Sequence, residues 1–271
     1  MRLKPLRLSA TAATLGSLAL LLVSCAAGGP PSPLGSAGGA ARPPALDGGT
    51  AHWSYVGDSG PSYWGTLSAE YAVCGSGMEQ SPIDIPADAM LRPDPVSISY
   101  AAVDEQVQNN GHSLQATSPK HNTVTRGGVE YALKQMHFHA PAEHLVGGEQ
   151  ADVEFHFVHE DADGNRLVIA VMGVVGASNA NWDGFVDAAS MAEGDSVLER
   201  VDWSALLPAD TAHSSYARSL TTPPCTEGVR WVVFATPVVL GQDQIDRLSS
   251  AYHANNRPVQ SLDGRTVTRS E

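Results

Sequence analysis

The sequence is poor in cysteine and in positive charge, and each shortage excludes some classes of structure or function. It holds three cysteines among 271 residues, too few for a scaffold stabilised mainly by disulfides. A zinc site made of four cysteines is also excluded, so any zinc would depend on the ten histidines. Lys and Arg number 16 against 29 Asp and Glu, which gives a net charge of −13. We expect no binding to nucleic acid, because that function needs clustered basic side chains.

Long apolar runs are also scarce, and the run at the N-terminus, Ala13–Val23, is short. A cationic start precedes it, formed by Arg2, Lys4 and Arg7. The run is shorter than the roughly 20 residues of a transmembrane helix, so an export signal over residues 1–24 is favoured over a membrane anchor. Leu22–Cys25 resembles the bacterial lipobox. This predicts cleavage before Cys25, a lipid on that cysteine, and attachment to the cell membrane facing the periplasm or the outside.

The next segment, residues 25–50, consists mostly of Ala, Gly, Pro and Ser without hydrophobic periodicity. That composition predicts a flexible tether. Aromatic residues begin at Trp53, so we expect one folded domain over residues 51–271, within the usual size range. The 42% hydrophobic content of the chain is enough for a core.

Two cysteines, Cys74 and Cys225, remain if Cys25 carries a lipid. An exported protein folds in an oxidising compartment, where a disulfide between them is the simple expectation. Two buried free thiols are the alternative.

Short β-rich or apolar segments, separated by Pro and Gly, indicate strands. They are Val96–Tyr100, Thr123–Thr125, Val129–His139, Asp152–His159, Leu167–Val175 and Val229–Val239. Two segments indicate helices, Asn181–Ala189 and Gln242–His253. Leu167–Val175 is apolar on both faces, which is typical of a central strand. The sequence therefore predicts a β-dominated α+β fold, with a large central, mostly antiparallel twisted sheet and short peripheral helices.

Histidines recur on two of the predicted strands. In Gln135–His139, alternation places the glutamine and both histidines on one face. In Glu154–His159, His156 shares a face with Glu154 and Val158. If the strands are neighbours, three imidazoles converge and leave a tetrahedral Zn²⁺ one open position, as in catalytic zinc sites. A histidine pair on a half-buried strand often has no chemical role, so the third histidine beside a carboxylate is what favours a metal.

Seven motifs follow one another between Trp53 and Arg265. They are Gln80–Asp84, Asn109–His112, Gln135–His139, Glu143–His144, Glu154–His159, Ser219–Pro224 and Asn255–Pro258. In this order and spacing they resemble the α-class carbonic anhydrases, in the compact exported form of bacteria. The resemblance implies reversible hydration of CO2 to bicarbonate and a proton by attack of zinc-bound hydroxide, with one Zn²⁺ per chain. Compact bacterial relatives are often dimers, so by analogy we expect a homodimer.

The resemblance also assigns the zinc ligands and the groups behind them. The ligands would be His137, His139 and His156. Their remaining ring N–H groups would donate to Gln135, to the backbone carbonyl of Asn255 and to Glu154. A disulfide would join Cys74 and Cys225, as in exported members of the family.

Further roles follow from the same resemblance. Thr221 would be the gatekeeper that donates to a buried Glu143, and His112 would be the proton shuttle. The pocket for CO2 would be lined by Val158, Val171, Leu220, Thr222 and Trp231, and the solvent network would include Tyr55 and Asn110.

One departure from the family concerns Arg218, which stands where the family usually has Gly. If that position needs a positive φ, Arg218 would be strained or the turn rebuilt. Among the other histidines, we expect His144 and His159 to be buried structural residues. Four are expected to be solvated, namely His52, His121, His213 and His253.

Two other classes of function compete with a zinc enzyme. A catalytically silent binding module would lack one or more of the ligand histidines, and a periplasmic zinc carrier would show a flexible His-rich or acidic tract. The sequence has neither feature. We therefore expect an enzyme whose partners are CO2 and bicarbonate, with no nucleic acid and with membrane contact only through the lipid on Cys25.

Overall fold

A computed structural model describes residues 51–118 and 122–271. The predicted signal, the tether with Cys25, and His121 lie outside the described residues. Within the described part, no helix combines the length and the apolar character needed to cross a membrane.

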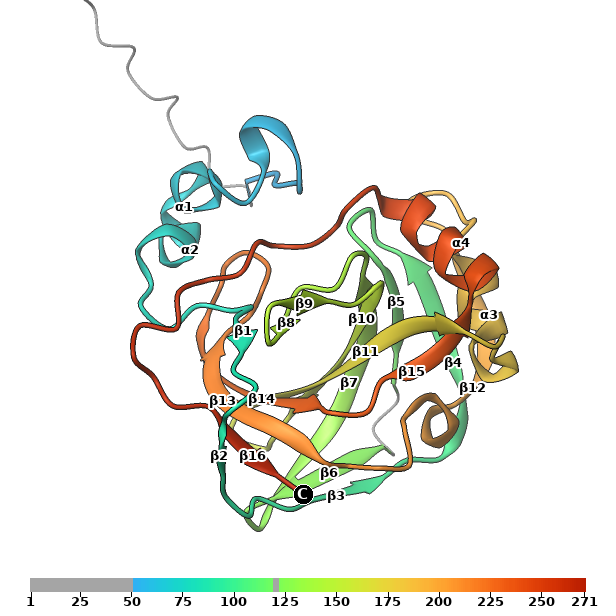
Figure 1. The fold of residues 1–271 in the computed structure, drawn as a ribbon. Coiled ribbons are helices and arrows are strands. Elements are labelled where there is room, and N and C mark those ends of the chain that lie inside the picture. The colour runs from blue at the N-terminus through green and yellow to red at the C-terminus, as the bar shows by residue number, and fades with distance from the viewer. Residues whose placement is uncertain (1–50, 119–121) are drawn as a thin grey trace, which may run out of the picture. The chain divides into compact units, whose positions relative to one another are not determined.

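Strands dominate the domain and form one large sheet beside a small one (Figure 1). In spatial order the large sheet contains β12 (Ser196–Asp202), β4 (Ala102–Asn109), β5 (Leu114–Thr117), β7 (Val129–His139), β10 (Val153–Glu160), β11 (Arg166–Gly176), β14 (Glu227–Phe234), β13 (His213–Ser219), β16 (Thr268–Ser270) and β2 (Met90–Leu91). Three more strands join it at the side: β3 (Val96–Ser99), β6 (Thr123–Arg126) and β15 (Val238–Gly241). The small sheet contains β1 (Asp84–Ile85), β8 (Leu145–Val146) and β9 (Glu149–Gln150).

The helices are short and peripheral. They are α1 (Trp64–Leu67), α2 (Val73–Ser76), α3 (Asp183–Ala188) and α4 (Gln242–Tyr252), with 3-10 turns η1 (Gly57–Ser59), η2 (Ala69–Tyr71), η3 (Ala180–Trp182) and η4 (Trp203–Leu206). Helix α3 packs on β4 and β12, while α4 packs on β11 and β15 (Figure 1). Ile245 and Leu248 of α4 are buried, as their helical spacing predicts.

Most strand pairs are antiparallel, and the predicted β-dominated α+β fold is confirmed. Strand β11 is the exception at the centre, because it pairs in parallel with β14 and β15. Its side chains are buried on both faces from Leu167 to Met172, as expected for a central strand.

Two cores lie on the two faces of β11. Ile169 and Val171 belong to one core, which also contains Phe138 and Phe155. Val168 and Ala170 belong to the other core, with Trp231. Because successive side chains of a strand point to opposite faces, this alternation decides which residues of β11 approach the histidines.

The sequence-based boundaries fail where polar residues form strands or where a strand ends early. The predicted strand Val229–Val239 is two strands, β14 and β15, separated by Ala235–Pro237. Proline cannot donate to a strand ladder, which explains a break near Pro237. The predicted helix Asn181–Ala189 begins as the 3-10 turn η3 and continues as α3. Strands β4 and β13 were not predicted, because their residues are largely polar.

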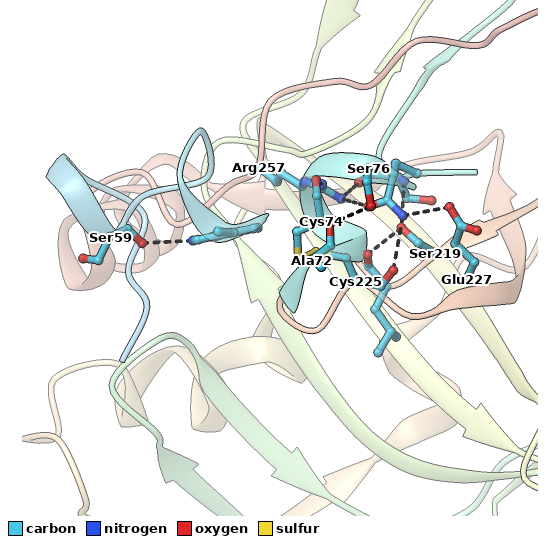
Figure 2. The surroundings of a disulfide bond; sticks show 12 residues. Ser59, Ala72, Cys74, Ser76, Ser219, Cys225, Glu227 and Arg257 are labelled. Atoms are coloured by element: carbon cyan, nitrogen blue, oxygen red, sulfur yellow. Dashed lines mark hydrogen bonds between the residues drawn. A yellow bond between two sulfur atoms is a disulfide. The ribbon is translucent and has the colours of Figure 1, made fainter. Parts of the chain in front are cut away.

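A disulfide joins Cys74 of α2 to Cys225 of the loop before β14, with an S–S distance of 2.07 Å. The pairing favoured by the sequence is therefore confirmed. Arg257 lies beside it and donates to the carbonyl of Cys74 at 2.8 Å (Figure 2). The same guanidinium donates to Gln80 and to the carbonyl of Ser81. The N-terminal helices are thus fixed both to the C-terminal segment and to the loop before β14.

Candidate metal centre

The three predicted ligand histidines meet at the pairing of β7 with β10. His137 lies opposite His156 in the antiparallel register, and His139 lies opposite Glu154. One ring nitrogen from each of His137, His139 and His156 lies within 4.8 Å of the others. The sequence placed these residues on the correct strand faces, and the register brings them together.

Each histidine has one nitrogen held by an acceptor. His137 Nδ1 bonds Gln135 Oε1 at 2.8 Å, His139 Nδ1 bonds the carbonyl of Asn255 at 2.7 Å, and His156 Nε2 bonds Glu154 Oε1 at 2.7 Å. These bonds leave Nε2 of His137, Nε2 of His139 and Nδ1 of His156 as free acceptors. Such partners orient ligating imidazoles and fix their tautomers in metal sites.

Burial keeps the imidazoles neutral. It lowers the pKa of His139 to about 4 and the pKa of His137 well below its usual range. The pKa of His156 is lowered too, first by burial, although Glu154 opposes this. Neutral rings are the form that binds a metal ion. Nε2 of His139 is buried and finds no hydrogen-bond partner among the described residues, so the site fits a cation that accepts three nitrogen ligands.

Glu154 supplies a fixed negative charge behind the ligands. Its Oε2 accepts the backbone N–H groups of Glu143 and His144, both at 2.7 Å. Its Oε1 bonds the rings of His144 and His156. Burial raises the pKa of Glu154, but these two histidines lower it well below its usual range. His144 also bonds the hydroxyl of Tyr216, so His144 is buried in a structural role, as predicted.

A second buried carboxyl group, Glu143, lies beside His139. Its Oε1 accepts the N–H of Arg257 at 2.7 Å, and its Oε2 lies 3.5 Å from His139 Nε2. Burial raises the pKa of Glu143 to about 7, while His156, the Thr221 hydroxyl and the Arg257 N–H act in the opposite direction. Thr221 is itself buried. The two residues predicted as a gate are therefore neighbours.

The apolar residues predicted to line the pocket lie in one cluster beside His156, with one exception, Val171. Val158, Leu220 and Trp231 pack in one cluster, as expected, and the Trp231 ring lies 4.9 Å from that of His156. Val171 lies on the other face of the sheet, opposite Phe155. Val168 takes its place, because it pairs with Val158 and with Trp231. Thr222 is half-buried beside Thr221.

His112 lies half-exposed in the turn between β4 and β5. Its ring stacks on Trp53, with centroids 3.8 Å apart. Burial and the nearby His52 lower the pKa of His112, whereas Glu193 raises it. Asn110 Oδ1 accepts the N–H of His112 at 3.0 Å, so Asn110 shapes the turn.

Asn255 connects this turn to His139, one of the candidate metal ligands. Its side-chain Nδ2 donates to the carbonyl of His112 at 3.0 Å, while its own carbonyl holds His139. Tyr55 is half-buried nearby, and its ring centroid lies 6.5 Å from that of His139. The buried residue Asn255 thus fixes His139 and the turn of His112 relative to each other.

The condition attached to Arg218 does not hold, and the prediction for His213 was wrong. Arg218 has no positive φ; it lies in β13 at an irregularity of the β13–β14 register. Its buried guanidinium donates to the carbonyl of Leu262 at 2.9 Å, so this fold accommodates the residue without left-handed backbone. His213 is buried rather than solvated, because it begins β13 between β14 and β16. His52 and His253 are exposed and His159 is buried, as predicted.

Sequence reasoning missed three residues that support the site: Val168, Tyr216 and the side chain of Arg257. Strand alternation shows that Val168 and Val171 lie on opposite faces of β11, but it does not show which of the two faces the histidines. The pairing of β11 with β10 decides this. Tyr216 carried no local signal, and Arg257 was noted only as part of the motif Asn255–Pro258. The partners of both side chains are distant in sequence.

Residues 59–271 match the family model of the eukaryotic-type carbonic anhydrases. A carbonic anhydrase of Pectobacterium atrosepticum is 38% identical over 223 residues, covering 80% of this chain and 91% of that protein. One from Klebsiella pneumoniae is 40% identical over 224 residues, covering 80% and 90%. Among solved structures, the α-carbonic anhydrase of Thermovibrio ammonificans, in complex with the inhibitor sulfanilamide, is 41% identical. It aligns with a TM-score of 0.76 and covers 81% of this chain and all of that one.

Proposed function

The chain belongs to the eukaryotic-type, or α-class, carbonic anhydrase family, and we propose that it hydrates CO2 reversibly to bicarbonate with one Zn²⁺ held by His137, His139 and His156. The observation that carries the proposal is the set of three converging, neutral imidazoles, each with its other nitrogen already bonded. When bound there, zinc supplies Lewis acidity that yields a nucleophile from water near neutral pH.

The gate orients that nucleophile. The Thr221 hydroxyl has two lone pairs and one proton. It would accept a hydrogen bond from the nucleophile and donate a hydrogen bond to Glu143. Glu143 has one oxygen engaged by Arg257 N–H, which leaves Oε2 for Thr221.

The apolar wall receives CO2, which offers no strong hydrogen-bond groups. Val158, Val168, Leu220 and Trp231 share one cluster beside His156. Their side chains exclude water from the approach to the nucleophile.

His112 carries the proton released in each turnover to the solvent. Its half-exposed ring, in a turn tied to Asn255, is suited to exchange protons with buffer. Tyr55 and Asn110 belong to the polar route towards it.

Export and lipid attachment at Cys25 complete the proposal. A tether over residues 25–50 would hold the catalytic domain at the outer side of the membrane. Mass spectrometry of protein extracted from membranes is expected to find a lipidated Cys25 as the first residue. An unmodified chain that starts elsewhere would contradict this location without affecting the chemistry.

Stopped-flow CO2 hydration, with zinc quantified in the same purified sample, tests the reaction. We expect about one zinc per chain and a rate abolished by a chelator. His137→Ala is expected to lose zinc and rate together, because two imidazoles cannot complete the site. Activity that persists without the metal would refute the mechanism. A zinc-loaded but inactive protein would instead indicate a silent binding module.

A further inference from the structure

A hollow of about 570 Å³ opens on the domain away from the metal centre, lined by the start of β7 and by residues of β13, β14 and β16. Tyr131 and His137 lie six residues apart on β7, which corresponds to about 20 Å along a strand. The hollow is therefore separate from the ligand histidines. It accounts for no step in the hydration of CO2.

Positive charge gathers in this hollow. Arg92, Arg126 and Arg230 all line it, although the chain as a whole carries a net charge of −13. Asp94, which also lines it, is held by Arg126 through both carboxylate oxygens. Arg92 and Arg230 form no ion pair with any acidic side chain in the described part of the chain. Two guanidinium groups of the lining thus have no acidic side chain in direct contact, although Asp161 lies close enough to Arg230 to feel its charge.

Hydroxyl groups complete the polar lining. Tyr131 is buried and accepts a hydrogen bond from Arg230, which limits the positions of that guanidinium. Ser215 is 5% exposed and stands beside Asp94 in the same lining. Thr266 and Thr268 stand at the same hollow.

We propose that this hollow binds a small organic molecule with two acidic groups, either carboxylates or phosphates. Guanidinium groups bind both kinds of anion through paired hydrogen bonds, and the two arginines without an ion pair match two acidic groups. The volume is in the range of pockets for small organic molecules and exceeds what one inorganic ion fills. Val129 and Ala217 offer carbon surface for the part between the two charged groups. The singly charged bicarbonate ion does not fit this description.

Isothermal titration calorimetry of the purified protein tests the proposal with two probes, succinate and fructose 1,6-bisphosphate, at matched ionic strength. Binding of either probe supports the site, and the difference between them identifies the preferred acidic group. Arg230→Gln and Arg92→Gln are each expected to weaken binding about tenfold or more, as for the loss of a charge-assisted hydrogen bond. Both side chains are exposed, so the fold should tolerate the changes.

Arg166→Gln is the matched control. It removes the same charge from a residue that also lacks an ion pair in the described part but does not line the hollow. We expect binding to this variant to stay within twofold of the parent protein. Equal weakening by all three substitutions would show general attraction between charges and overturn the proposal. Absence of binding of both probes at millimolar concentration would also overturn it.

Discussion

At the scale of the residue, the proposed metal centre depends on which ring nitrogen each histidine keeps free. Gln135, Glu154 and the Asn255 carbonyl settle this, each through a single hydrogen bond to a ligand. Glu154 also accepts two backbone N–H groups, so it fixes the loop at Glu143 and His144 as well. Glu154 therefore has a larger structural role than Gln135, which makes Gln135 the cleaner residue for testing ligand orientation.

Gln135→Ala is expected to weaken zinc binding by about 10- to 100-fold, because the His137 ring loses the acceptor that orients it. Competition with a chromogenic chelator measures the affinity. Gln115→Ala is the matched control, since Gln115 lies opposite His137 on β5 but makes no hydrogen bond to its ring. Equal losses in both variants would argue against an orienting role for Gln135.

His112→Ala is expected to keep zinc but to lower CO2 hydration by about tenfold or more in dilute buffer, because proton transfer to solvent loses its carrier. Added imidazole should restore the rate. His253→Ala, which changes an exposed histidine elsewhere, should leave the rate unchanged. A rate for His112→Ala that equals the parent rate at every buffer concentration would remove this residue from the shuttle role.

At the scale of the element, the backbones of the two N-terminal helices, α1 and α2, pack very close to each other. Helices α1 and α2 contact each other through Gly65 and Gly75. A methyl group on Gly65 would lie 2.7 Å from the backbone nitrogen of Gly75, whereas one on Gly75 would lie 3.4 Å from Cα of Gly65. The two glycines of one contact are therefore not equivalent.

Gly65→Ala is expected to lower the free energy of unfolding by about 1–3 kcal/mol, because backbone must move to admit the methyl group. Gly75→Ala is the control and should be nearly neutral or slightly stabilising, since alanine favours a helix over glycine. Denaturant unfolding monitored by tryptophan fluorescence measures both. The same loss in both variants would mean that the closer approach of the methyl group at Gly65 does not set the cost.

At the scale of the whole molecule, one covalent link joins segments that the fold brings together from opposite ends of the domain. Cys74 and Cys225 are 151 residues apart in sequence. They lie in a small core with Trp64 and Tyr71, apart from the two cores of the sheet. A closed loop of this length restricts the unfolded chain strongly.

The double variant Cys74→Ser, Cys225→Ser is expected to lose about 2–5 kcal/mol of unfolding free energy. A reducing agent should destabilise the parent protein by a similar amount and leave the variant unaffected. Parallel denaturant titrations with and without reductant measure this. A parent protein that is insensitive to complete reduction would show that the bridge contributes little stability.

Local sequence patterns predicted the features of this protein that depend on residues close together in the chain. Alternation along two strands placed His137, His139 and His156 on usable faces, and the helical spacing of α4 located its buried side. The predicted export to an oxidising compartment favoured a disulfide between Cys74 and Cys225. These features could be predicted from the sequence because strand and helix patterns depend on positions a few residues apart. The disulfide could be predicted because only two cysteines remained to pair in an oxidising compartment.

Contacts between distant segments decided the rest. The β7–β10 register joined the histidines, and the β10–β11 register chose Val168 over Val171. The buried polar strand β13 and the unstrained Arg218 depend on neighbours more than ten residues away. The arginine-lined hollow likewise collects residues from several strands. Packing selects such arrangements among many that the same local patterns allow, so only the tertiary structure could determine them.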